Sequence, residues 1–293
     1  PWCRQWFKTC LIQQNHYPVW QSEAMNTLSS VKRIGVIGSG SMGQALISGW
    51  TRFDASIVAV VRDVEKYQHL EGSLGIEVSE DRQVLSTCEV VVIAIKPQII
   101  KEILADFAPF IAPGAIVISV AVGVTTEFIG KCFPQTNQII KAMPNTPSQI
   151  HMGVTCVSGG QGCSEDAIAI AVELMGAVGD VFVVPEAQQA AVGALSGSGP
   201  AYLFYLAQYL QEGAQELGLS GELADQLVRA TLRGSGELLA RTELSAGDLR
   251  RQVTSPGGTT QAAMEVLDTQ RVGETVRLAL AAGVARSMEL GKG

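Results

Sequence analysis

The chain has 293 residues, of which 47% are hydrophobic and 17% are charged, and its formal net charge is -7. This balance excludes a disordered or fibrous chain, and an acidic surface has no general attraction for nucleic acid or anionic membranes. No run reaches the roughly 18 consecutive apolar residues that a membrane span needs. The length predicts about two domains.

Residues 1–30 differ from the rest of the chain. They contain three of the four tryptophans and no acidic residue before Glu23. No helical or strand period emerges from them. We predict that residues 1–30 are a disordered or non-native extension, with Met25 as the native start.

The six cysteines form no Cys-x-x-Cys pair, and the chain has only three histidines. These spacings predict no metal site. Scattered cysteines in a chain of this length are typical of reduced thiols. We therefore expect a cytoplasmic enzyme.

Apolar runs alternate with amphipathic stretches from residue 31 onward. Strands are predicted at residues 34–37, 56–61, 76–78, 90–95, 115–122 and 180–184. Because these runs lack an alternation of apolar and polar residues, both faces of the sheet should be covered. The pattern predicts a doubly wound, Rossmann-like dinucleotide-binding domain at residues 31–184.

A glycine-rich turn follows the first strand: Gly38, Ser39, Gly40, Ser41, Met42 and Gly43. The glycines leave room for a pyrophosphate, and the helix that begins there favours an anion at its N-terminus. An ordinary strand-to-helix turn is the alternative. The strand before it and the apolar helix after it favour a dinucleotide site.

Arg62 lies at the end of the second strand, 19 residues beyond Gly43 (62 - 43 = 19). In dinucleotide folds an arginine near this position accepts the 2′-phosphate of NADP, whereas an acid holds the ribose of NAD. Asp63 follows directly and fits the second role. A solvated charge at the strand end is the remaining interpretation of Arg62.

Two further segments carry candidate ligand contacts. Lys96 follows the strand at residues 90–95 and should face the cofactor, unless it is an ordinary surface lysine. Residues 141–147 contain two prolines, which predict a rigid loop presenting Asn145 and Thr146. A turn that connects domains would use the same residues.

Strand-like runs disappear beyond Pro185. Helical periods cover residues 188–217, 222–240 and 271–290, so an all-α domain is predicted at residues 185–293. Two glycines and a proline at residues 196–200 should break the first of these helices. Small residues there allow close approach by a ligand or by another helix.

The segment Val-Thr-Ser-Pro-Gly-Gly-Thr-Thr at residues 253–260 precedes a predicted helix at residues 261–267. It gathers free backbone N–H groups and hydroxyl side chains at a positive helix end, which suits a carboxylate. A helix cap by Thr259 or Thr260 is the alternative.

The residue types also limit the chemistry. After Lys141 the only lysine is Lys292, and after His151 there is no histidine. Alcohol dehydrogenation usually needs a positioned proton carrier, whereas an imine protonates readily near neutral pH. The composition therefore favours reduction of a carbon–nitrogen double bond by positioning and charge stabilisation.

Five segments together resemble pyrroline-5-carboxylate reductase. They are residues 38–43, 96–98, 143–147, 195–202 and, most specifically, 253–260. The resemblance runs from about residue 31 to residue 290. It implies reduction of the cyclic imine 1-pyrroline-5-carboxylate to L-proline, the last step of proline biosynthesis, by an oxidoreductase acting on CH–NH donors. It also implies an all-α C-terminal dimerisation domain and homodimers that assemble into rings.

The resemblance assigns roles by position. NADPH is the expected cofactor, with weaker use of NADH, and its matching positions are Gly38, Ser39, Gly40, Ser41, Met42, Gly43, Arg62, Ala94, Ile95, Lys96, Pro97, Val120, Ala121 and Val122. The substrate positions are Glu186, Val253, Ser255, Gly258, Thr259 and Thr260, and Thr260 takes the catalytic position beside the ring nitrogen.

Two rival functions remain at this stage. A hydroxyacid dehydrogenase of the same architecture would need a catalytic lysine in its helical domain, where this chain has only the near-terminal Lys292. A non-catalytic dinucleotide sensor would need the glycine-rich turn but not the segment at residues 253–260.

Overall fold

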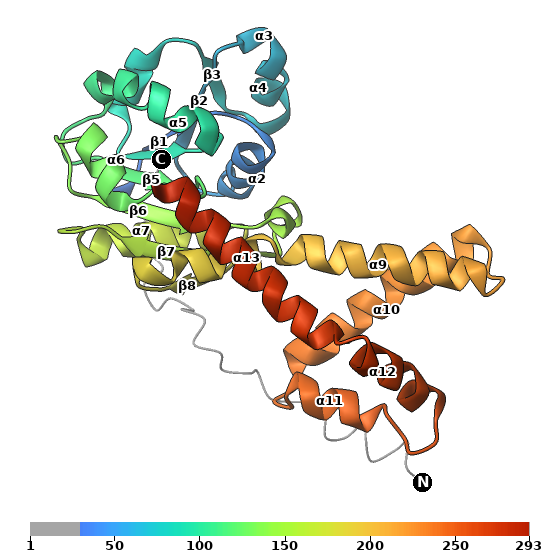
Figure 1. Cartoon of the computed structure of the whole chain (residues 1–293). Coiled ribbons are helices and arrows are strands. Elements are labelled where there is room, and N and C mark those ends of the chain that lie inside the picture. Colours follow the sequence, from blue (N-terminus) through green and yellow to red (C-terminus); the bar gives the residue numbers. More distant parts are fainter. Residues whose placement is uncertain (1–29, 293) are drawn as a thin grey trace. The chain divides into compact units, whose positions relative to one another are not determined.

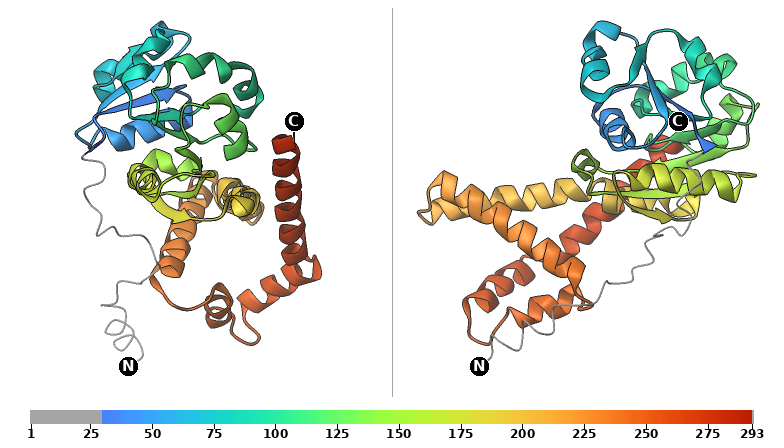
Figure 2. Two further views of the ribbon diagram at one scale, coloured as in Figure 1. Left: turned by 90° about the vertical axis from the view of Figure 1, so that its left-hand side faces the viewer. Right: turned by 180° about the vertical axis from the view of Figure 1, so that it is seen from behind.

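A computed structural model of the chain describes residues 30–292 (Figures 1 and 2). The described residues form two compact units, one made of residues 30–200 with 278–292 and the other of residues 201–277. Apart from Ser30, the predicted N-terminal extension lies outside the described residues. The predicted domain limits at residues 31–184 and 185–293 stay a prediction.

The first unit is built on a mixed sheet with the strand order β3-β2-β1-β4-β5-β6-β7-β8. All neighbouring strands run parallel except β6 and β7, where Met143 is paired with Cys156 in an antiparallel register. The strands are β1 (Arg33–Ile37), β2 (Ser56–Val60), β3 (Glu77–Ser79), β4 (Val90–Ile93), β5 (Ile116–Ser119), β6 (Ile139–Met143), β7 (Gly153–Gly159) and β8 (Gly179–Val183).

Helices cover both faces of this sheet (Figure 1). Buried side chains of α2 (Ser41–Trp50), α4 (His69–Leu74) and α7 (Glu165–Gly176) pack on one face. The other face is covered by η2 (Arg82–Thr87), α5 (Pro97–Ile103), η3 (Ala105–Phe110) and α6 (Thr126–Cys132). Trp50 is fully buried between layers and donates its indole N–H to Leu174 O at 2.8 Å. The doubly wound fold predicted from the apolar runs is confirmed.

The six predicted strands are present, most of them with shorter or slightly shifted bounds. Two strands, β6 and β7, were not predicted, and the rigid loop predicted at residues 141–147 begins as the last part of β6. Lys141 interrupts the apolar run of β6, and glycines begin and end β7. Both features weaken the strand signal in the sequence although the strands are largely buried.

The sequence beyond β8 is helical as predicted, and the first predicted helix is interrupted, as the two glycines and the proline at residues 196–200 predict. It is divided into η5 (Glu186–Gln188), α8 (Gln189–Val192), the π-helical turn η6 (Gly193–Gly197) and α9 (Gly199–Glu216). The later helices are α10 (Gly221–Arg241), α11 (Ala246–Gln252), α12 (Thr259–Thr269) and α13 (Val272–Lys292). Helix α11 was not predicted. Its N-terminus is a capping box formed by Ser245 and Asp248.

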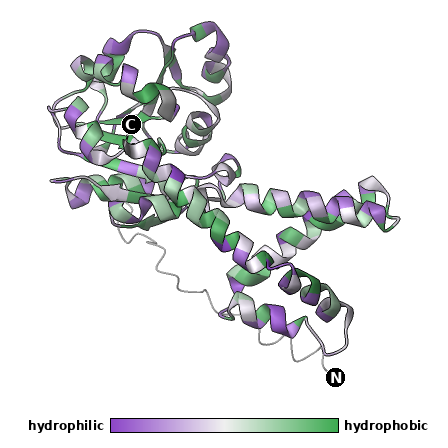
Figure 3. Ribbon diagram, viewed as in Figure 1, coloured by the Kyte–Doolittle hydropathy of each residue, from purple (hydrophilic) through white to green (hydrophobic). Residues whose placement is uncertain are grey.

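Apolar side chains are unusually exposed in the second unit. On α9 they include Leu203, Phe204, Tyr205 and Leu206, which are 49–64% exposed. Figure 3 shows hydrophobic residues all along these helices, interspersed with hydrophilic ones. Within residues 30–292 no helix combines the length and the apolar character that a bilayer crossing requires.

Candidate functional site

The glycine-rich turn joins β1 to α2 and leaves space above the helix N-terminus. Gly38 has φ +93°, a left-handed conformation that favours glycine. A Cβ on Gly43 would lie 2.6 Å from Gly38 O, whereas a Cβ on Gly40 would have no atom within 4 Å. Gly43 is therefore needed for close packing of the turn, and Gly40 borders open space.

The polar groups of this turn fit an anionic ligand. Gly40 is the N-cap of α2, and no side chain caps the free N–H groups of that helix. Ser39 is 2% exposed, and among the described residues its Oγ has no hydrogen-bond partner. Free donors at a positive helix end, beside an open glycine, suit the pyrophosphate of a dinucleotide.

The other predicted cofactor residues meet at the same edge of the sheet. Arg62 follows β2, residues 94–97 follow β4, and residues 120–122 follow β5. Gly38 N–H bonds to Val60 O at 3.0 Å, and Ala94 N–H bonds to Ile37 O at 2.9 Å. The strand order reverses between β1 and β4, and open α/β sheets bind ligands in the crevice at such a point.

Individual side chains at this edge differ in their surroundings. Lys96 is exposed at the N-cap of α5, and Arg62 is exposed with no salt bridge among the described residues. The carboxylate of Asp63 accepts the backbone N–H of Lys66 at 3.1 Å and caps α3 (Val64–Tyr67). The acid beside Arg62 therefore has a local structural role.

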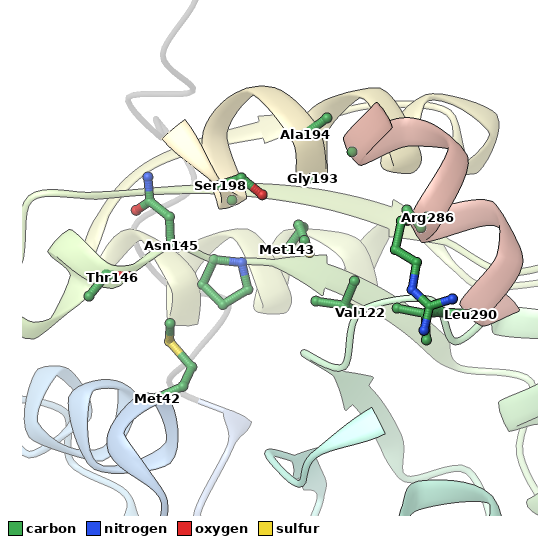
Figure 4. A pocket seen from close by; sticks show the side chains of 14 residues that line it. Met42, Val122, Met143, Asn145, Thr146, Gly193, Ala194, Ser198, Arg286 and Leu290 are labelled. Carbon is green, nitrogen blue, oxygen red and sulfur yellow. The ribbon is translucent and has the colours of Figure 1, made fainter. Parts of the chain in front are cut away.

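A pocket of about 360 Å³ opens within the first unit (Figure 4). Figure 4 shows Asn145 and Thr146 at one end of it and Val122, Arg286 and Leu290 at the other. The lining residues are Met42, Val122, Met143, Pro144, Asn145, Thr146, Gly193, Ala194, Gly197, Ser198, Gly283, Arg286, Ser287 and Leu290. Two of the predicted cofactor residues, Met42 and Val122, are among them.

The wall formed by η6 is held by Asn145. The side-chain amide of Asn145 donates to Ser196 O at 3.1 Å, and its carbonyl accepts the backbone N–H of Val154 at 2.8 Å. The π-helical turn is closed by the bond from Ser198 N–H to Gly193 O at 2.9 Å. π-Turns of this kind occur often at functional sites.

Helix α13 adds residues that sequence reasoning did not single out. Arg286 is the only charged side chain among the described residues that line the pocket, and it also pairs with Glu289 at 2.8 Å. In the sequence it is one arginine of an amphipathic helix, so no local pattern marks it.

Glu186 contacts a residue that the sequence did not mark as important. Its carboxylate accepts the backbone N–H of Thr126 at 2.8 Å and the Thr126 hydroxyl at 2.5 Å. Lys141 lies close enough to interact electrostatically with Glu186 and is 7% exposed. Burial lowers the pKa of Lys141, and the Glu186 carboxylate partly offsets this effect. A lysine inside an apolar run was the only sequence signal of this pair.

The predicted carboxylate-binding segment lies in the second unit and comprises the linker from α11 to α12 and the first two residues of α12. It contains Val253, Ser255, Gly258, Thr259 and Thr260. Gly258 is the N-cap of α12, and no side chain caps that helix. The hydroxyls of Thr259 and Thr260 therefore do not serve as the helix cap that was the alternative interpretation. Within residues 30–292, no three His, Cys, Asp or Glu side chains are grouped to hold a metal.

Profiles of known protein families match both the N-terminal and the C-terminal part of the chain. The family profile described as pyrroline-5-carboxylate reductase dimerisation matches residues 186–290. The profile described as NADP oxidoreductase, coenzyme F420-dependent, matches residues 33–123.

Several known proteins are similar over nearly their whole length. Pyrroline-5-carboxylate reductase of Synechocystis sp. is 36% identical, over 89% of this chain and 98% of that protein. The enzyme of the same name from Pseudomonas aeruginosa is 34% identical, over 89% and 97%. The structure of a pyrroline-5-carboxylate reductase from Coxiella burnetii is 37% identical and covers 89% of this chain and 98% of that one, with a TM-score of 0.82. The chain therefore belongs to the pyrroline-5-carboxylate reductase family.

Proposed function

We propose that the chain reduces 1-pyrroline-5-carboxylate to L-proline with NADPH, the last step of proline biosynthesis. Family membership over nearly the full length supports this activity. The observation that carries it is the uncapped N-terminus of α12, which offers free donors beside Ser255 and Thr259. A substrate carboxylate is the ligand that such a helix end favours.

The cofactor is held at the edge where β1, β2, β4 and β5 end. The pyrophosphate binds residues 38–43, the 2′-phosphate binds Arg62, and the segments 94–97 and 120–122 flank the nicotinamide. When bound, the reduced nicotinamide supplies a hydride to the imine carbon. The chain's part is to bind and orient both reactants and to exclude water.

The substrate is bound by the segment from Val253 to Thr260. Thr259 and Thr260 offer the free N–H groups of the first turn of α12 to the carboxylate, Gly258 lies beside it with its own N–H group bonded to Ser255 O at 3.0 Å, and Ser255 adds a hydroxyl. Thr260 hydrogen-bonds to the ring nitrogen, which carries the proton of the iminium form. The predicted contact of Glu186 with substrate stays a prediction, and the structure gives its carboxylate another partner in Thr126.

The match to a dimerisation domain supports a homo-oligomeric assembly. Residues 185–293 form the substrate and dimerisation domain, residues 31–184 form the dinucleotide domain, and the dimers assemble into a ring in the cytoplasm. The exposed apolar side chains of α9 support a homodimer, because a single chain leaves them in water.

Oxidation of NADPH in the presence of 1-pyrroline-5-carboxylate tests the activity. The same protein should not reduce NADP⁺ when 2-hydroxy or 3-hydroxy acids are supplied. Absence of imine-dependent turnover by folded protein would overturn the proposal. A hydroxyacid dehydrogenase would show the opposite substrate pattern, and a sensor would bind NADPH without turnover.

Thr260→Ala tests the substrate-binding segment. We expect kcat/KM to fall by about tenfold to a hundredfold, the value of a hydrogen bond to a charged group. Thr275→Ala is the matched control, because the Thr275 hydroxyl bonds to Arg271 O, the residue just before α13. Equal kinetics of Thr260→Ala and the wild type, at equal melting temperature, would remove Thr260 from the site.

A further inference from the structure

We propose that Glu186 is a positioning residue for hydride transfer. Its hydrogen bonds to Thr126 tie the loop after β5 (residues 120–125), which faces the cofactor, to the segment that continues into the pocket wall η6. This role rests on the proposed reductase function. In this role Glu186 positions the loop that faces the cofactor and does not itself contact the substrate.

The tie consists of two hydrogen bonds between residues 60 positions apart in the sequence. Thr126 N–H donates to one carboxylate oxygen at 2.8 Å, and the Thr126 hydroxyl donates to the other at 2.5 Å. Thr126 is 6% exposed, so water competes little for these bonds. Both carboxylate oxygens of Glu186 are therefore directed at the first residue of α6.

Lys141 lies within electrostatic range of this carboxylate. Lys141 is buried on β6, and its charge and that of Glu186 stabilise each other. Hydrogen bonds to an ionised acceptor are roughly twice as strong as neutral ones. Loss of the Glu186 charge would also leave the buried lysine uncompensated, which accounts for a carboxylate at this position rather than an amide.

One end of the tie is the loop at residues 120–125, which carries Val122 into the pocket. Gly123 in this loop has φ +73°, and a Cβ there would lie 2.7 Å from Leu290 Cβ. The loop therefore passes close to α13 and then enters α6 at the residue that Glu186 holds. Its position depends on contacts at both of these points.

The other end of the tie is fixed to the sheet. Gln189, three residues after Glu186, is 3% exposed and donates to Cys156 O at 3.2 Å and to Ser158 Oγ at 2.8 Å on β7. The same segment continues into η6, which forms another wall of the pocket. Glu186 thus projects from a firmly anchored backbone, and its side chain determines where the loop at residues 120–125 lies.

This arrangement separates positioning from substrate binding. The loop flanks the expected nicotinamide position, whereas the proposed carboxylate contacts come from residues 253–260. Release of the loop should misplace the reacting atoms, and a displacement near 1 Å can cost on the order of a hundredfold in rate. We therefore expect kcat to fall while the KM for 1-pyrroline-5-carboxylate changes little.

Kinetics of three variants test the proposal. Thr126→Val removes the hydroxyl and keeps the N–H group, Glu186→Gln removes the charge, and Thr126→Ser restores the hydroxyl. Thr126→Val and Glu186→Gln should each lower kcat by roughly tenfold. They should also raise the kinetic isotope effect measured with NADPH deuterated at the transferred position. Thr126→Ser should have a kcat close to that of the wild type. The Thr126→Val/Glu186→Gln double variant should be no slower than the worse single variant, because both act through one link.

Two controls separate this link from general effects. Glu127→Gln removes the neighbouring carboxylate, which pairs with Lys131 on the exposed side of α6. Thr125→Val removes the N-cap of the same helix without touching Glu186. Glu127→Gln should keep the wild-type isotope effect, and Thr125→Val, which leaves both bonds of Glu186 intact, should change it less than Thr126→Val does. A loss of rate in Thr125→Val equal to that in Thr126→Val would show that helix stability alone matters and would overturn the proposal.

Hydrogen exchange of the ligand-free protein gives a readout that does not depend on activity. Amides of residues 120–126 should exchange faster in Thr126→Val and in Glu186→Gln than in the wild type or in Glu127→Gln. Equal exchange would overturn the positioning role. If Glu186→Gln instead raised the substrate KM strongly while Thr126→Val kept wild-type kinetics, the Glu186 side chain would contact the substrate directly. If the wild type shows no imine turnover, the proposed function is wrong. The exchange experiment still tests whether Glu186 and Thr126 hold the loop at residues 120–125 in place.

Discussion

The predicted preference for NADPH over NADH depends on the neighbouring residues Arg62 and Asp63. The sequence left three interpretations: a 2′-phosphate arginine, a ribose-binding acid, or a solvated arginine at the strand end. In the structure Asp63 caps α3, while Arg62 is exposed at the ligand-binding edge of the sheet. This arrangement favours Arg62 as the residue that distinguishes NADPH from NADH.

Arg62→Ala should raise the KM for NADPH by about tenfold to a hundredfold, because a hydrogen-bonded contact to phosphate contributes about 1.5–3 kcal/mol. The KM for NADH should change little, since NADH has no 2′-phosphate. Steady-state kinetics with both cofactors measure this. Asp63→Asn is the control, and a selective rise in its KM for NADH would reassign recognition to the acid.

Cys88 predicts a pH dependence of stability. It is 1% exposed, and burial raises the pKa of its thiol from 9.0 to about 11. The unfolded chain therefore ionises this thiol at lower pH than the folded chain does. The stability that the neutral thiol contributes is complete below pH 9 and is lost as the pH rises to about 11.

Urea unfolding of the wild type and of Cys88→Ala across this pH range tests the argument. The unfolding free energy of the wild type should fall more steeply than that of the variant, by about 1 kcal/mol per pH unit. The Cys132→Ala variant should differ less from the wild type, because Cys132 is only half-buried. Parallel pH profiles for wild type and Cys88→Ala would contradict the predicted ionisation.

At the scale of elements, two glycines in the turn from β1 to α2 have different roles, one in packing and the other in ligand binding. Gly43→Ala should lower the unfolding free energy by about 1–3 kcal/mol, because its Cβ would overlap Gly38 O. Gly40→Ala should leave stability within about 0.5 kcal/mol of the wild type but weaken NADPH binding by roughly tenfold or more, because the methyl group enters the space for the pyrophosphate.

Denaturant unfolding and fluorescence titration with NADPH measure the two effects on the same protein samples. Each glycine variant is the control for the other. Unchanged NADPH affinity in Gly40→Ala would show that the open space beside this glycine is not the pyrophosphate site.

The elements that the sequence did not reveal share a physical cause. β6 holds a buried lysine whose charge is compensated by a residue 45 positions later (186 - 141 = 45), so its local composition does not indicate a strand. The glycines predicted a break at η6 but not its π-helical form, and Gly193 and Gly197 pack there against Met143 of β6, where a Cβ on either would lie 2.9 Å from Met143 Cε. In both cases a distant residue decides the local structure.

At the scale of the whole molecule, α9 predicts self-association. Its apolar side chains are half-exposed in a single chain, and such exposure is typical of an interface. Phe204→Glu should therefore shift the protein from dimer towards monomer. The charge would have to be buried without a partner.

Sedimentation velocity at micromolar concentration measures this shift. Gln68→Glu is the control, because it adds the same charge at an exposed residue just before α4. A dimer of unchanged stability in Phe204→Glu would place the interface elsewhere. Loss of activity together with the dimer would support a site that needs both subunits.

The sequence by itself determined the doubly wound domain, the glycine-rich turn, the helical C-terminal part and the family. Strand periods, glycine spacing and the segment at residues 253–260 are local patterns. They involve residues that are close together in the chain, so they can be recognised in the sequence alone. The positions of the expected cofactor residues followed as well, because the carboxyl ends of parallel strands meet at one edge.

Only the tertiary structure decided which groups act together. It paired Glu186 with Thr126 and Lys141, gave Asp63 the role of a helix cap, and brought Arg286 to a pocket with Met42 and Asn145. These contacts join residues that are up to about 240 positions apart (286 - 42 = 244), and no local pattern encodes a partner at that distance. Burial gives such pairs their strength, and burial is a property of the packed chain.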